Sequence, residues 1–146
     1  MYNIRVITTD DAAYNQVLAL RQMVLRDPLG MNLFDEDLRQ ERNHVIFVCE
    51  NEEGKVIGCT MIHRLIASSY KLRQMAVRPD WQNKGVGSAL VKAAEQYCKE
   101  RNVDFLSFYA RITAMDFYAS LGYVPVGEPF EHIGILHIEM VKKLSY

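Results

Sequence analysis

The sequence predicts an α/β (α+β) fold, with one mixed, mostly antiparallel, twisted sheet of about six or seven strands and helices on both faces. Strand-like and helix-like segments follow one another in the order β-α-α-β-β-β-α-β-α-β-β. The three middle strands form a meander, whereas later strands alternate with helices. About half of the 146 residues are apolar, and no linker or repeat interrupts them. We therefore expect a single domain over residues 1–146.

The first half of the chain supplies a strand, a helix and the meander. Residues 4–7 are apolar and β-branched, which predicts a strand. Asp10 and Asp11 are candidate caps of a helix that Pro28-Leu29-Gly30 ends, and residues 31–42 predict a loop with a short helix. Strands are predicted at 45–50 and 56–65, around a polar turn at 51–55, and at 70–77. The apolar residues of the first helix are Tyr14, Val17, Leu18 and Leu25.

The second half alternates helices and strands. Residues 85–101 show an amphipathic period, and the apolar run at 103–109 is typical of a buried strand. A short helix at 113–121 ends at Gly122, and two final strands are predicted at 123–127 and 135–141. The apolar stripe of the longer helix comprises Val86, Leu90, Ala93, Ala94 and Tyr97.

Composition narrows the functional classes. The chain has 17 basic and 18 acidic residues, and this balance argues against a non-specific nucleic-acid binder. Its three cysteines form no C-x-x-C, so we expect buried reduced thiols at Cys49 and Cys59, and no residue spacing indicates a metal site. The amino terminus has no apolar signal region and no segment is long enough for a membrane span, so we expect a cytoplasmic protein.

The segment most informative about function is a strand, a turn and a helix start. Residues 72–77 predict the strand, and the turn Gln82-Asn83-Lys84-Gly85-Val86-Gly87-Ser88 leads into the helix. Two glycines at a helix start allow close approach of a ligand to the backbone, and the first helical N–H groups have no partner within the helix. These N–H groups, with Gln82 and Lys84, predict a site for a pyrophosphate. The string fits neither a Walker A loop nor a G-x-G-x-x-G dinucleotide fingerprint.

Two strings resemble the GNAT superfamily of acyl-CoA-dependent N-acetyltransferases. Gln82–Gly87 resembles the family's [Q/R]-x-x-G-x-[G/A] loop, and Ala114–Tyr123 resembles its A-x-x-F-Y-x-x-x-G-[F/Y] helix. The resemblance covers the chain from about Val56 onward. The tail at 127–137 is similar to the smaller ElaA-like branch, which usually has proline where this chain has Leu136.

The resemblance implies that acetyl-CoA binds as co-substrate. The strand ending at Val77 would separate from the strand near Val103, and the pantetheine arm would bind backbone groups of Met75 and Val77 along it. The pyrophosphate would bind the amides of Asn83–Ser88, while Ala114, Phe117 and Tyr118 would line the thioester. The implied cofactor residues are Met75, Ala76, Val77, Gln82, Asn83, Lys84, Gly85, Val86, Gly87, Ser88, Ala114 and Phe117.

Transfer of an acetyl group to an amine passes through an oxyanion, so the site needs an N–H donor, an acid and a base. A backbone amide at the end of the 75–77 strand is the candidate donor, and the resemblance makes Tyr118 the catalytic acid or a hydrogen-bond donor to the leaving sulfur. Strand alternation places His137 and Glu139 on one face, and Glu128, Glu131 and His137 are candidates for the base or the acceptor site. Arg111, where many relatives carry Asn, would contact an acidic substrate or pair with a carboxylate on the next helix. Trp81 would shield the loop or pack under the helix.

We expect an N-acetyltransferase acting on a primary amine of a small molecule or peptide, by direct attack in a ternary complex. The alternative is a non-catalytic acyl-CoA-binding sensor or regulatory module, and a nucleic-acid-binding domain ranks last. The first helices and the tail would shape the acceptor pocket. The protein is expected to be a monomer or a homodimer.

Overall fold

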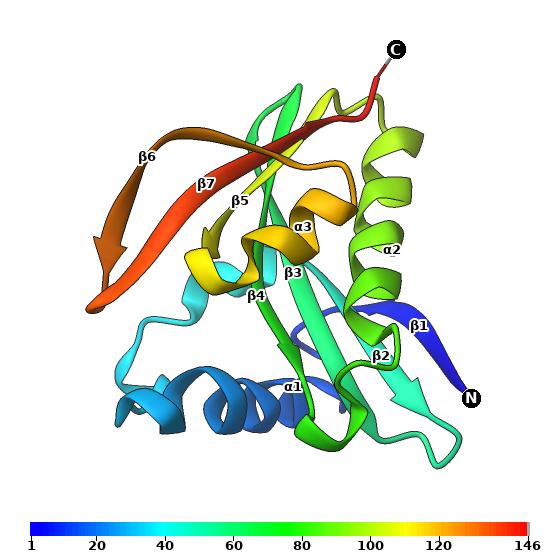
Figure 1. Cartoon of the computed structure of the whole chain (residues 1–146). Coiled ribbons are helices and arrows are strands. Elements are labelled where there is room, and N and C mark those ends of the chain that lie inside the picture. Colours follow the sequence, from blue (N-terminus) through cyan, green and yellow to red (C-terminus); the bar gives the residue numbers. More distant parts are fainter. Residues whose placement is uncertain (146) are drawn as a thin grey trace. The chain divides into compact units, whose positions relative to one another are not determined.

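The strands of the computed structural model, which describes residues 1–145, pair in the order β1-β2-β3-β4-β5-β7-β6 (Figure 1). They are β1 (Tyr2–Ile7), β2 (Val45–Asn51), β3 (Val56–Ile66), β4 (Ser69–Val77), β5 (Phe105–Arg111), β6 (Val124–His132) and β7 (Ile135–Lys143). The pair β4–β5 is parallel, whereas β1–β2, β2–β3, β5–β7 and β6–β7 are antiparallel. The predicted mixed, mostly antiparallel sheet is confirmed.

Within residues 1–145, three α-helices and six shorter turns connect the strands. The α-helices are α1 (Tyr14–Arg21), α2 (Val86–Glu100) and α3 (Met115–Ser120). The shorter turns are the π-helical η1 (Gln22–Arg26) and the 3₁₀ turns η2 (Asp27–Leu29), η3 (Leu33–Asp35), η4 (Arg39–Asn43), η5 (Pro79–Trp81) and η6 (Ile112–Ala114). In the described chain, no helix combines the length and apolar character that a membrane crossing requires. The chain forms two compact units, an amino-terminal unit of Met1–His63 and Gln74–Ala94 and a carboxy-terminal unit of Arg64–Arg73 and Glu95–Tyr146.

The first helix begins without the predicted cap and changes its type along its length. Neither Asp10 nor Asp11 is its cap: α1 follows Ala13 without a side-chain cap, and Asp11 instead accepts a hydrogen bond from the Ala13 N–H at 2.9 Å. After Arg21 the helix widens into the π-helical turn η1, which apolar periodicity does not indicate. The predicted end is confirmed, because Gly30 adopts a left-handed φ of 67° after η2.

The core of the amino-terminal unit lies on one face of β1–β3, under α1. It contains Ile7, Ala13, Val17, Leu20, Ile46, Val48, Val56, Cys59, Met61 and Ala76. Gly58 directly precedes the core residue Cys59 on β3. Gly58 faces α2, since a Cβ at this position would lie 2.7 Å from Val86 Cγ1 and 3.1 Å from Leu90 Cδ1. Because successive strand residues point to opposite faces, α1 and the start of α2 cover opposite faces of β3. The predicted arrangement of helices on both faces is thereby confirmed within this unit.

In the carboxy-terminal unit, α3 packs on β5 and β6. The chain enters β5 two residues later than predicted, because the Val103 N–H still closes the end of α2 by donating to the Cys98 carbonyl at 3.0 Å. α3 ends as predicted at Gly122, whose φ is 96°. The N–H of Gly122 donates to Ala119 and that of Tyr123 to Tyr118, which is a Schellman motif.

The last hairpin is longer than the sequence predicts. β6 continues through 128–132, past a register shift between Val126 and Phe130. Its turn is Ile133-Gly134, with φ values of 53° and 69°. Positive φ at both turn residues matches the twist of the flanking strands, but isoleucine seldom adopts it, so no turn signal marks the site.

Candidate functional site

The turn before α2 leads into three backbone donors that have no partner within the helix. The first bond of the helix runs from the Ala89 N–H to the Gly85 carbonyl at 3.0 Å, so the N–H groups of Val86, Gly87 and Ser88 have no partner within the helix. Gly85 has a φ of 84°, at which a residue with a side chain would be strained. Because Gly85 has no side chain, none caps the three N–H groups from this position. The residues from Gln82 to Gly85 are exposed. These three N–H groups thus lie at the positive end of a fifteen-residue helix, the arrangement that favours an anion.

Side chains around the turn join it to β4. Gln82, predicted as a donor to the anion, donates from Nε2 to the Val77 carbonyl at 3.0 Å, and this bond connects the turn to the last residue of β4. Lys84 Nζ lies 5.2 Å from the centre of the Trp81 ring, within cation–π range. Trp81 itself meets the ring of Tyr2 edge-on at 6.3 Å. Trp81 thus packs against β1 and supports Lys84 beside the turn.

The predicted pantetheine strand contains a kink. Gln74 has a φ of 55° in the middle of β4, directly before Met75, Ala76 and Val77. Ala76 is buried in the core, whereas Met75 and Val77 are half-buried. In the other unit, the pairs of β4 with β5 run from Ser69–Phe105 to Lys71–Ser107.

The predicted catalytic tyrosine belongs to the carboxy-terminal unit. Tyr118 on α3 is buried against Phe108, at 4.1 Å between ring centres, and against Phe117, at 4.9 Å. Burial raises the pKa of the Tyr118 phenol to about 12, so the hydroxyl keeps its proton at neutral pH. Within residues 1–145 this hydroxyl has no hydrogen-bond partner, and it is free to donate. Ala114 precedes α3 and is half-buried, and the ring of Phe117 is 40% exposed.

The end of α3 is held by buried polar groups. Glu95 accepts a hydrogen bond from the Tyr123 hydroxyl at 2.7 Å and from Lys142 Nζ at 3.2 Å. Lys142 Nζ also donates to the Leu121 carbonyl at 2.9 Å, where α3 ends. These bonds fix the helix that carries Tyr118.

The structure brings together two of the four predicted acceptor-site residues. Arg111 on β5 lies directly opposite His137 on β7, and His137 lies opposite Phe130 on β6, with 6.0 Å between the two rings. Glu131 lies opposite Leu136, so it points to the other face of the sheet.

The four predicted acceptor-site residues also differ in their exposure and in their polar partners. Glu128 is exposed at the register shift of β6. Arg111 makes no ion pair with a described residue, so the predicted pair with a carboxylate on the next helix does not form. His137 Nδ1 lies 2.8 Å from the Ile135 carbonyl, so the tautomer with a proton on Nδ1 leaves Nε2 as an acceptor.

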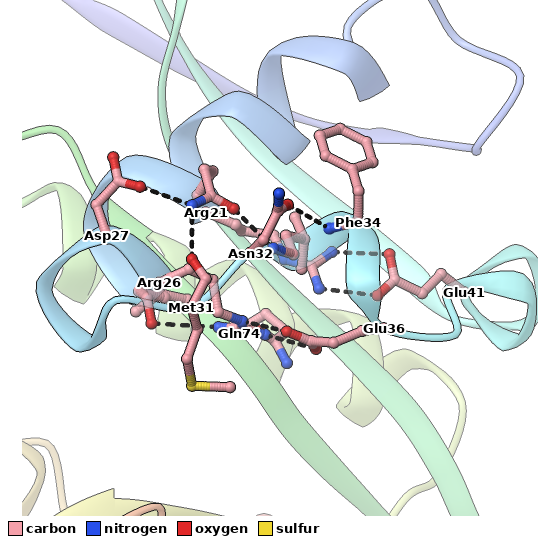
Figure 2. A network of polar contacts seen from close by, with 12 residues as sticks. Arg21, Arg26, Asp27, Met31, Asn32, Phe34, Glu36, Glu41 and Gln74 are labelled. Carbon is pink, nitrogen blue, oxygen red and sulfur yellow. Dashed lines mark hydrogen bonds and ion pairs between the residues drawn. The ribbon is translucent and has the colours of Figure 1, made fainter.

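A buried polar cluster that no sequence pattern predicted lies around Arg21 and Glu41 (Figure 2). The guanidinium of Arg21 binds the carboxylate of Glu41 through two bonds, at 2.7 and 2.9 Å, and Tyr14 donates to the same carboxylate at 2.6 Å. Burial, the largest influence, acts to raise the pKa of Glu41, but the hydrogen bonds from Arg21 and Tyr14 lower it overall. The available signal was Arg21 itself, a charge on the apolar stripe that contains Leu18 and Leu25.

A cavity of about 480 Å³ lies beside this cluster. It is lined by Thr9, Tyr14, Phe34, Glu36, Asp37, Leu38, Arg39 and Arg42. Its carboxylates are already paired, Asp37 with Arg39 and Glu36 with Arg26. Across the described part of the chain, no three His, Cys, Asp or Glu side chains gather in a way that would hold a metal ion.

Comparison with known proteins assigns this geometry to a family. Residues 10–144 match the model of the acetyltransferase (GNAT) domain. YitI of Bacillus subtilis, an uncharacterised N-acetyltransferase, is 40% identical over 79 residues, which are 53% of this chain and 53% of that protein.

Several solved structures share the fold. A structure from Lactobacillus plantarum that is described as an N-acetyltransferase has a TM-score of 0.88 at 21% identity, over 99% of both chains. ElaA of Escherichia coli has a TM-score of 0.84 at 17% identity, over 97% of this chain and 99% of that one. An aminoglycoside 6′-N-acetyltransferase in complex with coenzyme A has a TM-score of 0.83 at 13% identity, over 99% of this chain and 98% of that one. Because the family model spans nearly the whole chain, this protein belongs to the GNAT acetyltransferases and is an N-acetyltransferase.

Proposed function

We propose that this protein transfers the acetyl group of acetyl-CoA to a primary amine of a small molecule or peptide, by direct attack in a ternary complex, and that residues 1–146 form one GNAT domain. The open amides of Val86, Gly87 and Ser88 at the start of α2 carry the proposal. They fit a pyrophosphate, because they have no partner within the helix and because Gly85, which is exposed directly before them, has no side chain to cap them.

Residues at the end of β4 are proposed to orient the pantetheine arm. In the proposal, Met75 and Val77 bind the pantetheine through backbone groups, and the Gln82–Val77 bond keeps the strand end next to the anion turn. A backbone N–H of residues 75–77 stabilises the negative charge that develops on the carbonyl oxygen. Lys84 adds positive charge beside the turn.

Tyr118 acts on the leaving group. With a pKa of about 12, its phenol is a poor acid toward a thiolate whose conjugate acid has a pKa near 8.5. Tyr118 therefore stabilises the departing sulfur by donating a hydrogen bond, rather than by losing its proton. Phe117 on the same helix and Ala114, the residue directly before that helix, border this position.

The proposed contacts to the acceptor amine come from β5 and β7. Arg111 and His137 share one face of β5 and β7, and we propose that they contact the acceptor, with His137 Nε2 able to take a proton. Glu131 does not share that face, and Glu128 is exposed at the register shift, so neither adds to the pair. The cavity of the amino-terminal unit has room for a small amine.

Two measurements on the purified protein test the proposal. Calorimetric titration with coenzyme A is expected to show one saturable site, and acetyl-CoA with a panel of primary amines is expected to release free thiol in proportion to acetylated amine. No binding of coenzyme A would refute the proposal. Binding without turnover on any amine or peptide would instead favour a non-catalytic acyl-CoA sensor.

A further inference from the structure

The kink in β4 needs a cause, because Gln74 has a Cβ. Left-handed backbone, here with a φ of 55°, is unfavourable for such a residue and persists only where its surroundings hold it. The kink lies immediately before Met75, the first residue proposed to bind the pantetheine. Whatever holds Gln74 therefore sets the direction of the N–H and C=O groups that follow.

Arg26 holds the side chain of Gln74 (Figure 2). Its Nη2 donates to Gln74 Oε1 at 3.2 Å, while the same guanidinium binds both carboxylate oxygens of Glu36, at 2.5 and 3.0 Å. The Arg26 side chain is only 11% exposed, and its guanidinium lowers the pKa of Glu36. A planar fork that binds two partners in this way fixes the position of both.

The position of Arg26 is itself fixed by the π-helical turn η1. Gln22, at the other end of η1, donates to Asp27 Oδ1 at 2.6 Å and to the Met31 carbonyl at 2.9 Å, and accepts from the Leu33 N–H at 2.7 Å. The loop that brings Glu36 to Arg26 is thus tied down at its start. Short π-helical segments of this kind are frequent at functional sites.

We propose that Arg26, held by Glu36, is a positioning residue for acyl-CoA: it clamps Gln74 in the left-handed kink and so aims the backbone groups of Met75–Val77 at the pantetheine. The inference rests on the proposed function. Without the clamp, Gln74 is free to relax toward extended backbone, which turns the peptide groups after it away from the ligand.

The test compares Arg26→Met, Glu36→Gln and Gln74→Met with the control Arg5→Met. Arg5 also forms a forked pair, with Glu50 and Asp11, in the same unit, but it has no bond to β4. The readouts are the Kd of acetyl-CoA by calorimetry, kcat and KM separately, the unfolding midpoint, and the amide resonances of residues 75–77 without ligand.

We expect Arg26→Met and Gln74→Met each to weaken acetyl-CoA binding about tenfold and to shift those resonances, since each removes a hydrogen bond to a charged group. The double variant Arg26→Met/Gln74→Met should lose little more acetyl-CoA affinity than either single variant, because both substitutions break the same contact. Arg26→Lys should restore only part of the affinity, since an ammonium lacks the fork. Arg5→Met should lower the unfolding midpoint without changing the Kd.

A wild-type Kd in folded Arg26→Met would overturn the inference, with or without shifted resonances. If Arg26→Met does not fold, the isosteric Glu36→Gln decides in the same way. The failure of the proposed function looks different: wild-type protein then binds no acetyl-CoA at all. In that case unshifted resonances of residues 75–77 in Arg26→Met would still refute the clamp.

Discussion

Substitution of Gly85 by aspartate tests the anion site with the fewest assumptions. Gly85 has a φ of 84°, and a Cβ there would meet only Tyr2 Oη, at 3.6 Å, so the change adds backbone strain and a negative charge without a steric clash. Gly54, in the hairpin between β2 and β3, is a matched control with a φ of 77° and nothing within 4 Å of its would-be Cβ. Alanine at both positions isolates the strain.

The magnitudes separate the two effects. Left-handed backbone costs about 1–2 kcal/mol for a residue with a Cβ, which corresponds to roughly 3–6 °C in Tm for a chain of this size. All four variants should show this loss. The charge acts only at position 85: a carboxylate about 4 Å from a phosphate charge costs about 1 kcal/mol in water and about 4 kcal/mol near a protein surface. Since the turn is exposed, the expected loss of affinity lies between these limits, at roughly a hundredfold.

The assay is a calorimetric titration of coenzyme A into each folded variant at two salt concentrations. Gly85→Asp should bind roughly a hundredfold more weakly than Gly85→Ala, and the difference should shrink at high salt because the charges are screened. Gly54→Asp and Gly54→Ala should bind like the wild type. If Gly85→Asp bound coenzyme A within about threefold of Gly85→Ala, the turn would not hold the pyrophosphate.

Three further predictions follow from the side-chain contacts. Tyr118→Phe should lower kcat more than it weakens acetyl-CoA binding, and equal turnover would remove the proposed role of the hydroxyl. The pKa of Glu41 is lowered in the folded state. The ionised Glu41 carboxylate therefore stabilises the fold above its unfolded pKa of about 4.3, and this stabilisation is lost as the pH falls from that value through the folded pKa. Acid unfolding followed by circular dichroism should accordingly be steeper in the wild type than in Glu41→Gln. Lys142→Met removes the bonds to Glu95 and to the end of α3, and should lower Tm by roughly 4–8 °C, for a loss of about 2 kcal/mol; an unchanged Tm would show that the network adds no stability.

Local signals explain why the element order and the start of α2 were predictable. The strand, the glycines and the amphipathic helix of residues 72–101 are all encoded by neighbours in sequence, so α2 begins within one residue of the prediction. Gly30 and Gly122 ended their helices as predicted, because only glycine adopts a positive φ at low cost.

Long-range pairing accounts for what was missed. Arg26 reaches Gln74 over 48 positions in the sequence, and Arg21 reaches Glu41 over 20, so no local pattern reports either contact. The kink at Gln74 has no glycine to announce it, and neither has Ile133 in the last turn. The two acceptor candidates that separate, Glu131 and His137, do so because the hairpin pairs Glu131 with Leu136, and Leu136 and His137 are successive residues of β7 that point to opposite faces.

Gly58 lets β3 pack closely against the start of α2, where the coenzyme is proposed to bind. The first turn of α2 lies so close to β3 that a single methyl group at position 58 would have to displace Val86, whose own N–H is one of the open amides. Alanine at position 58, unlike the glycine-to-alanine changes that often stabilise proteins, is therefore expected to disturb the start of α2. Under the proposed function, a substitution at position 58 would change coenzyme affinity from the interior of the amino-terminal unit, by moving Val86.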